Sequence, residues 1–296
     1  MNISEKRYYI FDTLFHLLVS TLFFYKAVNE NHYYWILVSA FSEYKLGLIA
    51  HEGCHKAIDR TYGYIYDLFL GSSEQWIQKH NKGHHLEVNK KTDPDVQLMP
   101  LLRIRQEQNL YFYHSFQQWY QYLLFIFAAL PLRLNGVYYI FSKKRGLDLY
   151  RQLLIWSPGL SLFLTYPIFM YGIPGIVFWL LQNAIIGFLY GIIFSVSHVN
   201  EKSYFNDTET NFSIMQLDET ADWSAGSTFW NYMTGGLNHQ VIHHLYPHKS
   251  SYHYPSMVKN VITKYGEKYH RYDNLPKIIA SNWRFMKKLS NRKLIQ

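Results

Sequence analysis

The chain has 296 residues, of which 49% are hydrophobic and 19% aromatic, and its formal net charge is +8. This length suits one large domain or two small ones, and the single cysteine, Cys54, excludes an intrachain disulfide. Apolar residues gather in residues 9–27 and 153–197, whereas residues 72–110 and 199–228 are polar, which is typical of a membrane protein with a sizeable aqueous part. The basic residues lie mostly beside apolar segments, so the charge indicates membrane lipids as partners and no nucleic acid.

Five segments are apolar enough to consider as membrane spans, namely residues 9–27, 33–50, 119–141, 153–171 and 174–197. A span needs about 20 apolar residues. The second segment contains Glu43 and Lys45, which predicts that it packs against other parts of the protein. The third is interrupted by Pro131, Arg133 and Asn135, so it is the candidate for a helix that does not cross the membrane.

Eight histidines gather in three short clusters and at the end of the last apolar segment. They are His51, His55, His80, His84, His85, His198, His243 and His244. A spacing of four residues, as in His51/His55 and His80/His84, places two side chains on one face of an α-helix. Imidazole is a good ligand for iron, zinc and copper. Eight imidazoles exceed what one ion can use, so the sequence predicts two metal ions. In the third cluster, either His239 or Gln240 could complete the set.

Histidines that share metals must lie on one side of the membrane. The second and third clusters are separated by three apolar segments, and an even number of crossings requires that one of them stays on the surface. We expect residues 119–141 to form an interfacial amphipathic helix. Four transmembrane helices remain, at about 9–27, 33–50, 153–171 and 174–197.

The loops on the histidine side carry Arg103, Arg105 and Arg151, whereas the turn at residues 172–175 carries no Lys or Arg. This asymmetry predicts that both termini and all clusters are cytoplasmic. The expected fold is an all-α integral membrane protein with one domain over residues 1–296. Residues 51–118 and 198–296 would form its cytosolic, metal-binding helical cap.

Some residues near the clusters have two interpretations. Glu52, Asp93 and Asp95 are candidates to orient the ligand imidazoles, or they are solvated carboxylates and helix caps. Three aromatic residues are candidates for an apolar substrate tunnel, although aromatic residues near a membrane are more often belt or core residues. They are Trp76, Phe229 and Tyr232.

A competing interpretation starts from His51-Glu52-x-x-His55, which matches the H-E-x-x-H pattern of zinc peptidases. An intramembrane peptidase would leave the five histidines of the other two clusters unexplained. A metal transporter, the non-enzyme alternative, should have ionisable residues along its spans, but these histidines gather at span ends.

The three clusters resemble the histidine boxes of membrane fatty acid desaturases. The resemblance covers roughly residues 45–255 and rests on H-E-x-x-H at 51–55, H-N-x-x-H-H at 80–85 and Q-x-x-H-H at 240–244, with Gly-Gly-Leu-Asn leading into the third box. Gln240 in place of histidine is similar to the front-end branch, which desaturates toward the carboxyl end. The chain differs from that branch in carrying His239 and in lacking a His-Pro-Gly-Gly motif of a fused cytochrome b5 domain.

The resemblance implies an oxygen-dependent fatty acyl desaturase with two iron ions bound mainly by the eight histidines. Its substrate would be a fatty acyl lipid or acyl thioester, and a separate ferredoxin- or cytochrome b5-type protein would supply electrons. A bacterial inner membrane fits better than the endoplasmic reticulum. The same site could instead produce a hydroxylated or acetylenic chain, because the outcome after the first hydrogen abstraction depends on fine geometry.

Overall fold

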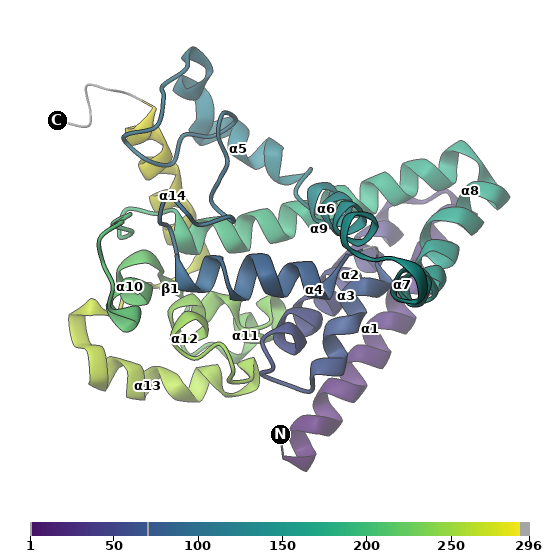
Figure 1. Ribbon diagram of the computed structural model, residues 1–296, viewed down its shortest axis with the longest axis horizontal. Helices are drawn as coiled ribbons and strands as arrows, with labels where there is room; N and C mark the ends of the chain where they lie inside the picture. Colours follow the sequence, from purple (N-terminus) through teal and green to yellow (C-terminus); the bar gives the residue numbers. More distant parts are fainter. Residues whose placement is uncertain (1, 70, 291–296) are drawn as a thin grey trace. The chain divides into compact units, whose positions relative to one another are not determined.

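A computed structural model describes residues 2–69 and 71–290 of the chain. These residues are helical apart from turns, loops and two short strands, β1 (Asp222–Trp223) and β2 (Arg271–Tyr272), which pair in parallel (Figure 1). The expected all-α fold class is confirmed. The described residues form two compact units, one within Met1–Trp76 and Phe125–Gly191 and the other within Ile77–Leu124 and Ile192–Gln296. The single domain over residues 1–296 stays a prediction.

The first unit contains the three longest helices described, α1 (Ile3–Glu30), α2 (Tyr33–Cys54) and most of α9 (Ile173–His198), together with shorter ones. The shorter helices are α3 (Tyr64–Leu68), α4 (Ser73–Trp76), α6 (Ala129–Lys143), α7 (Gly146–Leu160) and α8 (Tyr166–Tyr171). Helix α1 begins at a capping box, in which the Asn2 side chain accepts a hydrogen bond from Glu5 N at 2.9 Å. It ends at Asn31, whose left-handed backbone conformation stops the helix, so α1 and α2 form a hairpin.

The hairpin buries ionisable side chains together with its apolar core. Lys45 on α2 is 2% exposed and lies within electrostatic range of Asp12 and Glu52. Tyr9 on α1 donates a hydrogen bond to Glu52 at 2.9 Å. Glu43 is paired with Arg133 of α6. Because each of these charges has an opposite charge or a hydrogen-bond donor nearby, the apolar segment around Glu43 and Lys45 packs against protein, as expected.

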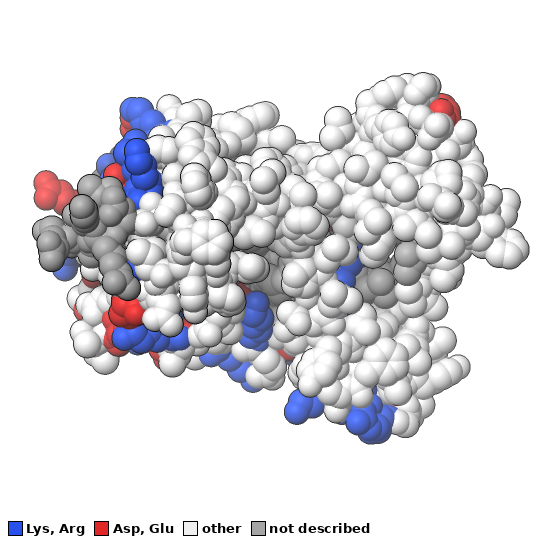
Figure 2. All heavy atoms as spheres, turned by 90° about the horizontal axis from the view of Figure 1, so that it is seen from above, with Lys and Arg blue, Asp and Glu red and all other residues white. Residues whose placement is uncertain are grey.

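Within residues 2–69 and 71–290, two helices are long and apolar enough to cross a membrane, α1 and α9. A third candidate exists if the stretch Phe112–Phe125 and helix α6 count as one broken span. The expected span at residues 153–171 lies within α7, a π-helical turn at Ser161–Thr165 and α8. Large uncharged areas cover the face drawn in Figure 2. The membrane-protein class is therefore supported, while four spans stay a prediction.

Residues 119–141 do not form one continuous helix. The segment is divided between α5 (Gln117–Phe125) and α6, with a break at residues 126–128. Pro131 lies in the first turn of α6, where its missing N–H is tolerated. Inside a longer helix its ring would clash with the carbonyl of residue 127, which explains why the helix is interrupted before it.

The second unit carries the shorter helices. They are α5, the end of α9, α10 (Phe212–Glu219), α11 (Thr228–Thr234), α12 (Gln240–Leu245), α13 (Tyr254–Tyr265) and α14 (Leu275–Leu289). Its core surrounds α12: Val241, Ile242 and Leu245 pack with Leu217 of α10 and Tyr254 of α13. Helix α12 holds the third histidine cluster, so this core fixes the backbone of that cluster.

Candidate metal centre

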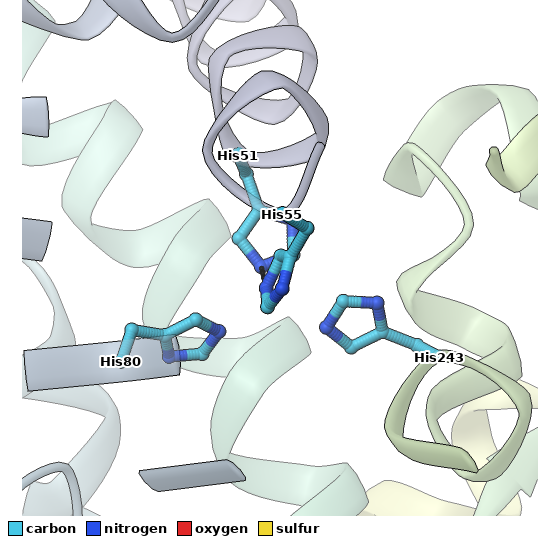
Figure 3. A group of neighbouring side chains, drawn as sticks. All are labelled: His51, His55, His80 and His243. Atoms are coloured by element: carbon cyan, nitrogen blue, oxygen red, sulfur yellow. Dashed lines mark hydrogen bonds between the residues drawn. The ribbon is translucent and has the colours of Figure 1, made fainter. Parts of the chain in front are cut away.

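The first unit contributes one pair of histidines. His51 lies in the last turn of α2 and His55 is its C-terminal cap residue (Figure 3). Both are buried, and their Nε2 atoms are 3.2 Å apart. This separation fits one N–H···N hydrogen bond or, when both nitrogens are unprotonated, two ligands of one cation. The helical spacing in the sequence predicts this pairing correctly.

The second cluster belongs to the second unit and is not α-helical. His80 lies in a π-helical turn, Ile77–Asn81, and His84 and His85 begin a 3-10 turn, His84–Leu86. The expected α-helix is therefore wrong, but the rings of His80 and His84 still stack, with centroids 5.1 Å apart. The departure from an α-helix is explained by Gly83, where a Cβ would stand 2.3 Å from the carbonyl oxygen of Lys79. This close approach permits only glycine, which weakens an α-helix.

Two carboxylates contact the rings of this cluster, which agrees with the first of their two interpretations. Asp93 Oδ2 is 2.8 Å from His84 Nδ1, and Asp95 Oδ2 is 2.8 Å from His80 Nδ1. A hydrogen bond at Nδ1 fixes the ring and directs Nε2 at another partner. The third expected carboxylate, Glu52, belongs to the first unit and accepts the bond from Tyr9.

The same contacts set the charge states. Burial opposes protonation of His84, but the charge and hydrogen bond of Asp93 outweigh it and raise the pKa of His84. For His80 burial prevails over Asp95, and its pKa is lowered. Burial would raise the pKa of Asp95, but its bond to His80 and the nearby cations lower it below its usual range. Asp95 is thus a carboxylate at neutral pH, able to hold an imidazole N–H.

Helix α12 presents His243 and His244 to partners that the sequence did not identify. His244 Nδ1 is 2.7 Å from the side-chain oxygen of Gln216 on α10, and the Gln216 amide nitrogen donates to the His85 carbonyl at 3.0 Å. His243 Nδ1 is 3.3 Å from the hydroxyl of Tyr254. Gln216 precedes His244 by 28 residues and matches no metal motif, so only the folded chain identifies it.

The end of α9 distinguishes Gln240 from His239. Gln240 Nε2 is 2.9 Å from Nε2 of His198, the last residue of α9. His239 instead accepts a hydrogen bond at Nε2 from Gly226 N at 2.9 Å, and burial lowers its pKa to about 4. Within the second unit, Gln240 therefore lies beside a cluster histidine, while His239 stabilises the loop before α11.

The second unit contains two histidine triads suited to a cation. In each triad the candidate ligand nitrogens all lie within 4.8 Å of one another, and all the residues are buried. The triads are His84, His198 and His244, and His85, His243 and His244. His244 Nε2 has no hydrogen-bond partner among the described residues. Burial and the neighbouring imidazoles lower the pKa of His244 well below its usual value, so its ring is neutral. A neutral, buried imidazole with an unpartnered nitrogen, such as that of His244, fits a transition-metal ion.

The expected tunnel residues lie in both units. The Trp76 ring centroid is 6.2 Å from that of His51 in the first unit. Phe229 on α11 is 60% exposed, and Tyr232 on the same helix is half-buried. Their tunnel role stays a prediction.

Arg103 and Arg105 are not solvated. Both are buried and bind the chain internally, Arg103 to the Gln108 carbonyl at 2.9 Å and Arg105 to Glu107 and Asp207 at 2.8 and 2.6 Å. Because their guanidinium N–H groups form hydrogen bonds within the protein, the two arginines stabilise the loop before α5.

The chain is similar to known proteins over most of its length. The family model for fatty acid desaturases matches residues 30–276, which include all three clusters and His198. The sn-1 linoleoyl-lipid 6-desaturase of Synechocystis is 30% identical over 267 residues, covering 80% of this chain and 74% of that protein. The chloroplastic acyl-lipid (7-3)-desaturase of Chlamydomonas reinhardtii is also 30% identical, over 81% of this chain. The acyl-lipid (8-3)-desaturase B of Dictyostelium discoideum is 29% identical, again over 81% of this chain.

The alignment covers 53% of the Chlamydomonas protein and 60% of the Dictyostelium protein, so the chain spans little more than half of these two relatives. Over the matched part, however, the histidine clusters fall inside the family region. The relatives are named as acyl-lipid desaturases, which are oxidoreductases, and with the family match they show that the chain belongs to the fatty acid desaturase family.

Proposed function

We propose that the chain introduces a carbon–carbon double bond into a fatty acyl chain. One –CH2–CH2– unit, one dioxygen, two electrons and two protons give –CH=CH– and two waters. The acyl chain and an external donor each supply two of the four electrons that reduce dioxygen. The observation that carries the proposal is the pair of buried histidine triads in a member of the desaturase family.

The proposed cofactor is a pair of iron ions bound by the eight histidines. His84, His198 and His244 would form one ligand set. His80, His85 and His243 would belong to the other, and His51 and His55 are the remaining ligands predicted from the sequence. Iron bound in this way would supply the oxidising power that side-chain acids and bases lack. Gln240 is a neighbour of the first set through its contact with His198.

The protein's own contribution is orientation and exclusion of water. Asp93, Asp95 and Gln216 each contact the Nδ1 atom of one histidine, which in the neutral ring places the proton on Nδ1 and leaves the Nε2 lone pair for the ion. All eight histidines are buried. A dry site protects a reactive oxidant from water and from side reactions.

The proposed substrate is an acyl group carried on a membrane lipid. The relatives are named for acyl-lipid or linoleoyl-lipid substrates, which supports a lipid over an acyl thioester. Gln240 supports a double bond on the carboxyl side of an existing one. The acyl chain would run past Trp76, Phe229 and Tyr232. A separate ferredoxin- or cytochrome b5-type donor would supply the electrons.

The proposed location is a bacterial inner membrane with the metal site on the cytoplasmic side. We assign four spans to α1, α2, the stretch from α7 to α8, and α9. Residues 119–141 would lie at the interface, because an even number of crossings then separates the second cluster from the third.

The test is the fatty acid profile of a bacterial host that expresses the chain together with a ferredoxin and its reductase. The wild type should produce a new unsaturated fatty acid, and derivatisation of the double bond should locate it. His84→Ala and His244→Ala should each lower this product by at least about 100-fold, because each removes a proposed ligand. His248→Ala, at an exposed histidine outside the clusters, is the matched control and should retain wild-type product.

The outcomes separate the alternatives. A hydroxylated or acetylenic product that requires His84 and His244 would assign the same site to a different oxidation. Unchanged desaturation in either ligand variant, at equal protein level, would refute the ligand assignment. Purified protein containing one zinc ion and no iron would support the peptidase interpretation instead.

A further inference from the structure

Asn89 occupies a junction inside the second unit that no metal motif includes. It is fully buried, and its φ is +56°, the left-handed conformation that asparagine tolerates better than most residues. It lies four positions after His85, the last histidine of the second cluster. Its backbone and side chain contact four different segments, and two of these lead to histidines of one triad.

The first connection runs to His84. Asn89 N donates to Asp93 Oδ2 at 2.8 Å, and the same oxygen is 2.8 Å from His84 Nδ1. Two donors that share one carboxylate oxygen hold it in place from both sides. The Asp93 carboxylate is 0% exposed, so water does not compete for it. The position of Asn89 therefore sets the position of the carboxylate that orients His84.

The second connection runs to His198. The Asn89 side-chain amide donates to the His198 carbonyl at 2.8 Å. The last four carbonyls of a helix lack donors from the helix itself, and His198 ends α9. Its carbonyl is satisfied by Asn89 together with the Ser203 hydroxyl at 2.7 Å. Asn89 thus caps the helix end from which the His198 ring projects.

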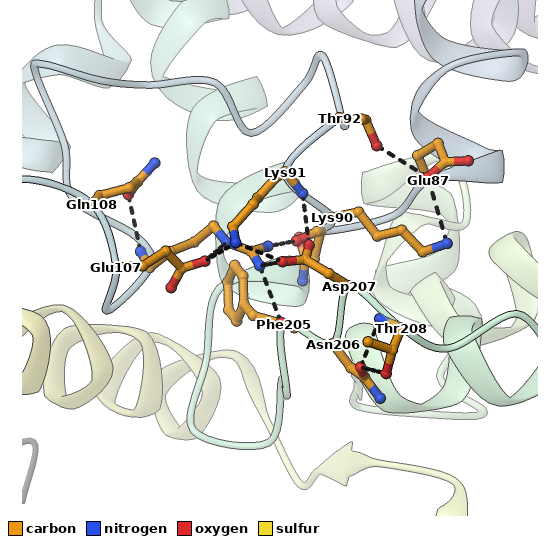
Figure 4. A network of polar contacts seen from close by, with 12 residues as sticks. Glu87, Lys90, Lys91, Thr92, Glu107, Gln108, Phe205, Asn206, Asp207 and Thr208 are labelled. Atoms are coloured by element: carbon orange, nitrogen blue, oxygen red, sulfur yellow. Dashed lines mark hydrogen bonds and ion pairs between the residues drawn. The ribbon is translucent and has the colours of Figure 1, made fainter.

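The junction is itself held by charged groups. The same Asn89 amide donates to the Glu219 carbonyl at 3.0 Å and to its side chain at 3.1 Å. Arg105 donates to the Asn89 carbonyl and pairs with Asp207. Lys91 lies 3.3 Å from Asp207 and 3.5 Å from Glu107 in the surrounding network (Figure 4). Asn89 is therefore anchored on several sides, and its amide has little freedom to follow a displaced partner.

We propose that Asn89 is a positioning residue that fixes the separation of His84 and His198 in the first ligand set. The ring centroids of these two histidines are 4.7 Å apart, yet they lie 114 positions apart in the chain (198 − 84). Asn89 connects them through two hydrogen bonds: its backbone N–H binds the Asp93 carboxylate that contacts His84, and its side-chain amide binds the His198 carbonyl. This inference rests on the proposed function, because it concerns the ion that His84, His198 and His244 would share.

The test compares metal binding by the full-length protein in detergent. Asn89→Gly keeps the left-handed backbone and removes the amide, and Asn89→Asp keeps the shape but replaces the donor. Each protein is loaded with Co²⁺, and its visible spectrum and a chelator titration are recorded. We expect wild type to bind two ions. In both variants the affinity of one ion should fall about 10- to 100-fold, with a change in its spectrum, while the other ion is unaffected.

Two matched variants separate positioning from general loss of stability. Asn231→Ala removes another buried asparagine amide, which donates to the Ser251 carbonyl at 2.9 Å. Asn31→Gly replaces another left-handed asparagine, with φ of +52°, in the first unit. Both should keep the wild-type spectrum and both affinities. If Asn231→Ala lowers the thermal midpoint as much as Asn89→Gly and alters cobalt binding equally, Asn89 is merely structural and the proposal fails.

Wild-type cobalt binding in both Asn89 variants would also overturn the proposal while leaving the proposed function intact. Binding of no ion by the wild type, by contrast, would overturn the proposed function and this inference with it.

Discussion

At the scale of single residues, the histidines of the second unit differ in what holds their Nδ1 atom. His80 and His84 face carboxylates, His244 faces the amide oxygen of Gln216, and His243 faces the hydroxyl of Tyr254. A carboxylate that accepts the Nδ1–H bond makes the Nε2 atom of the imidazole more basic, and so a stronger metal ligand, than an amide oxygen or a hydroxyl does. The two triads are therefore chemically unequal, since His84 occurs in only one of them.

Another buried carboxyl, that of Asp222, contacts the start of the helix that holds the third cluster. It accepts hydrogen bonds from Val241 N at 2.6 Å, at the start of α12, and from the Tyr269 hydroxyl. Burial raises the pKa of Asp222 from 3.8 to about 7, against the lowering effect of these donors. A folded-state pKa above the unfolded one means that the protonated group stabilises the fold at low pH. This stability is lost as the pH rises from about 4 through about 7.

Asp222→Asn should remove this dependence. Between pH 5 and pH 7 the wild type should lose up to about 1.4 kcal/mol of unfolding free energy per pH unit relative to the variant, and the difference should level off above pH 7. Thermal or denaturant unfolding of both proteins in detergent, followed by tryptophan fluorescence, measures it. Parallel pH profiles for the two proteins would show that Asp222 ionises freely in the folded state.

At the scale of elements, the α1–α2 hairpin depends on its buried charges. Lys45→Met would remove the buried ammonium group that lies within electrostatic range of Asp12 and Glu52, and the loss of one member of a buried charge network typically costs about 3–5 kcal/mol. We expect a large drop in the thermal midpoint, recovered in part by adding Asp12→Asn. The control is Lys26→Met, which removes an exposed ion pair with Glu30 at 3.8 Å and should cost less than about 1 kcal/mol. Equal effects of the two lysine substitutions would contradict the buried network.

The broken segment at residues 119–141 illustrates the limit of periodicity at this scale. Its apolar pattern predicts one amphipathic helix. The chain is helical on both sides of the break, in α5 and α6, but not across it. Pro131 is compatible with the first turn of α6 but not with a continuous helix. A proline marks a boundary in the sequence, but its presence does not say whether the chain bends, breaks or starts again.

At the scale of the whole molecule, cysteine labelling can measure the number of membrane-spanning helices. In a Cys54→Ala background, single cysteines replace three exposed residues: His32, Lys143 and Lys277. A membrane-impermeant maleimide is applied to intact cells. The proposed four spans predict that position 32 is labelled from outside and that positions 143 and 277 react only after permeabilisation.

The other arrangements give different patterns. Two spans, α1 and α9, would place positions 32 and 143 on the same side. Three spans that include the broken pair would place positions 143 and 277 on opposite sides. Either pattern would overturn the four-span topology without affecting the family assignment.

The family, the helical membrane class and a set of candidate metal ligands are all predictable from the sequence alone. These depend on local features: apolar runs long enough for α1 and α9, and histidines with short, regular spacing. The roles of Asp93 and Asp95 can also be predicted from the sequence, because these residues follow the second cluster by only a few positions. His51 and His55 pair as the helical spacing predicts.

The groups that form hydrogen bonds with those histidines are visible only in the folded chain. Gln216, Tyr254 and Asn89 act across 11 to 131 positions of sequence, where no periodic pattern connects donor and acceptor. The choice between His239 and Gln240 is of the same kind. Adjacent residues project in different directions, and the partner on α9 is 42 positions away. Hydrogen bonds depend on distance and angle in space, and a linear pattern does not contain either.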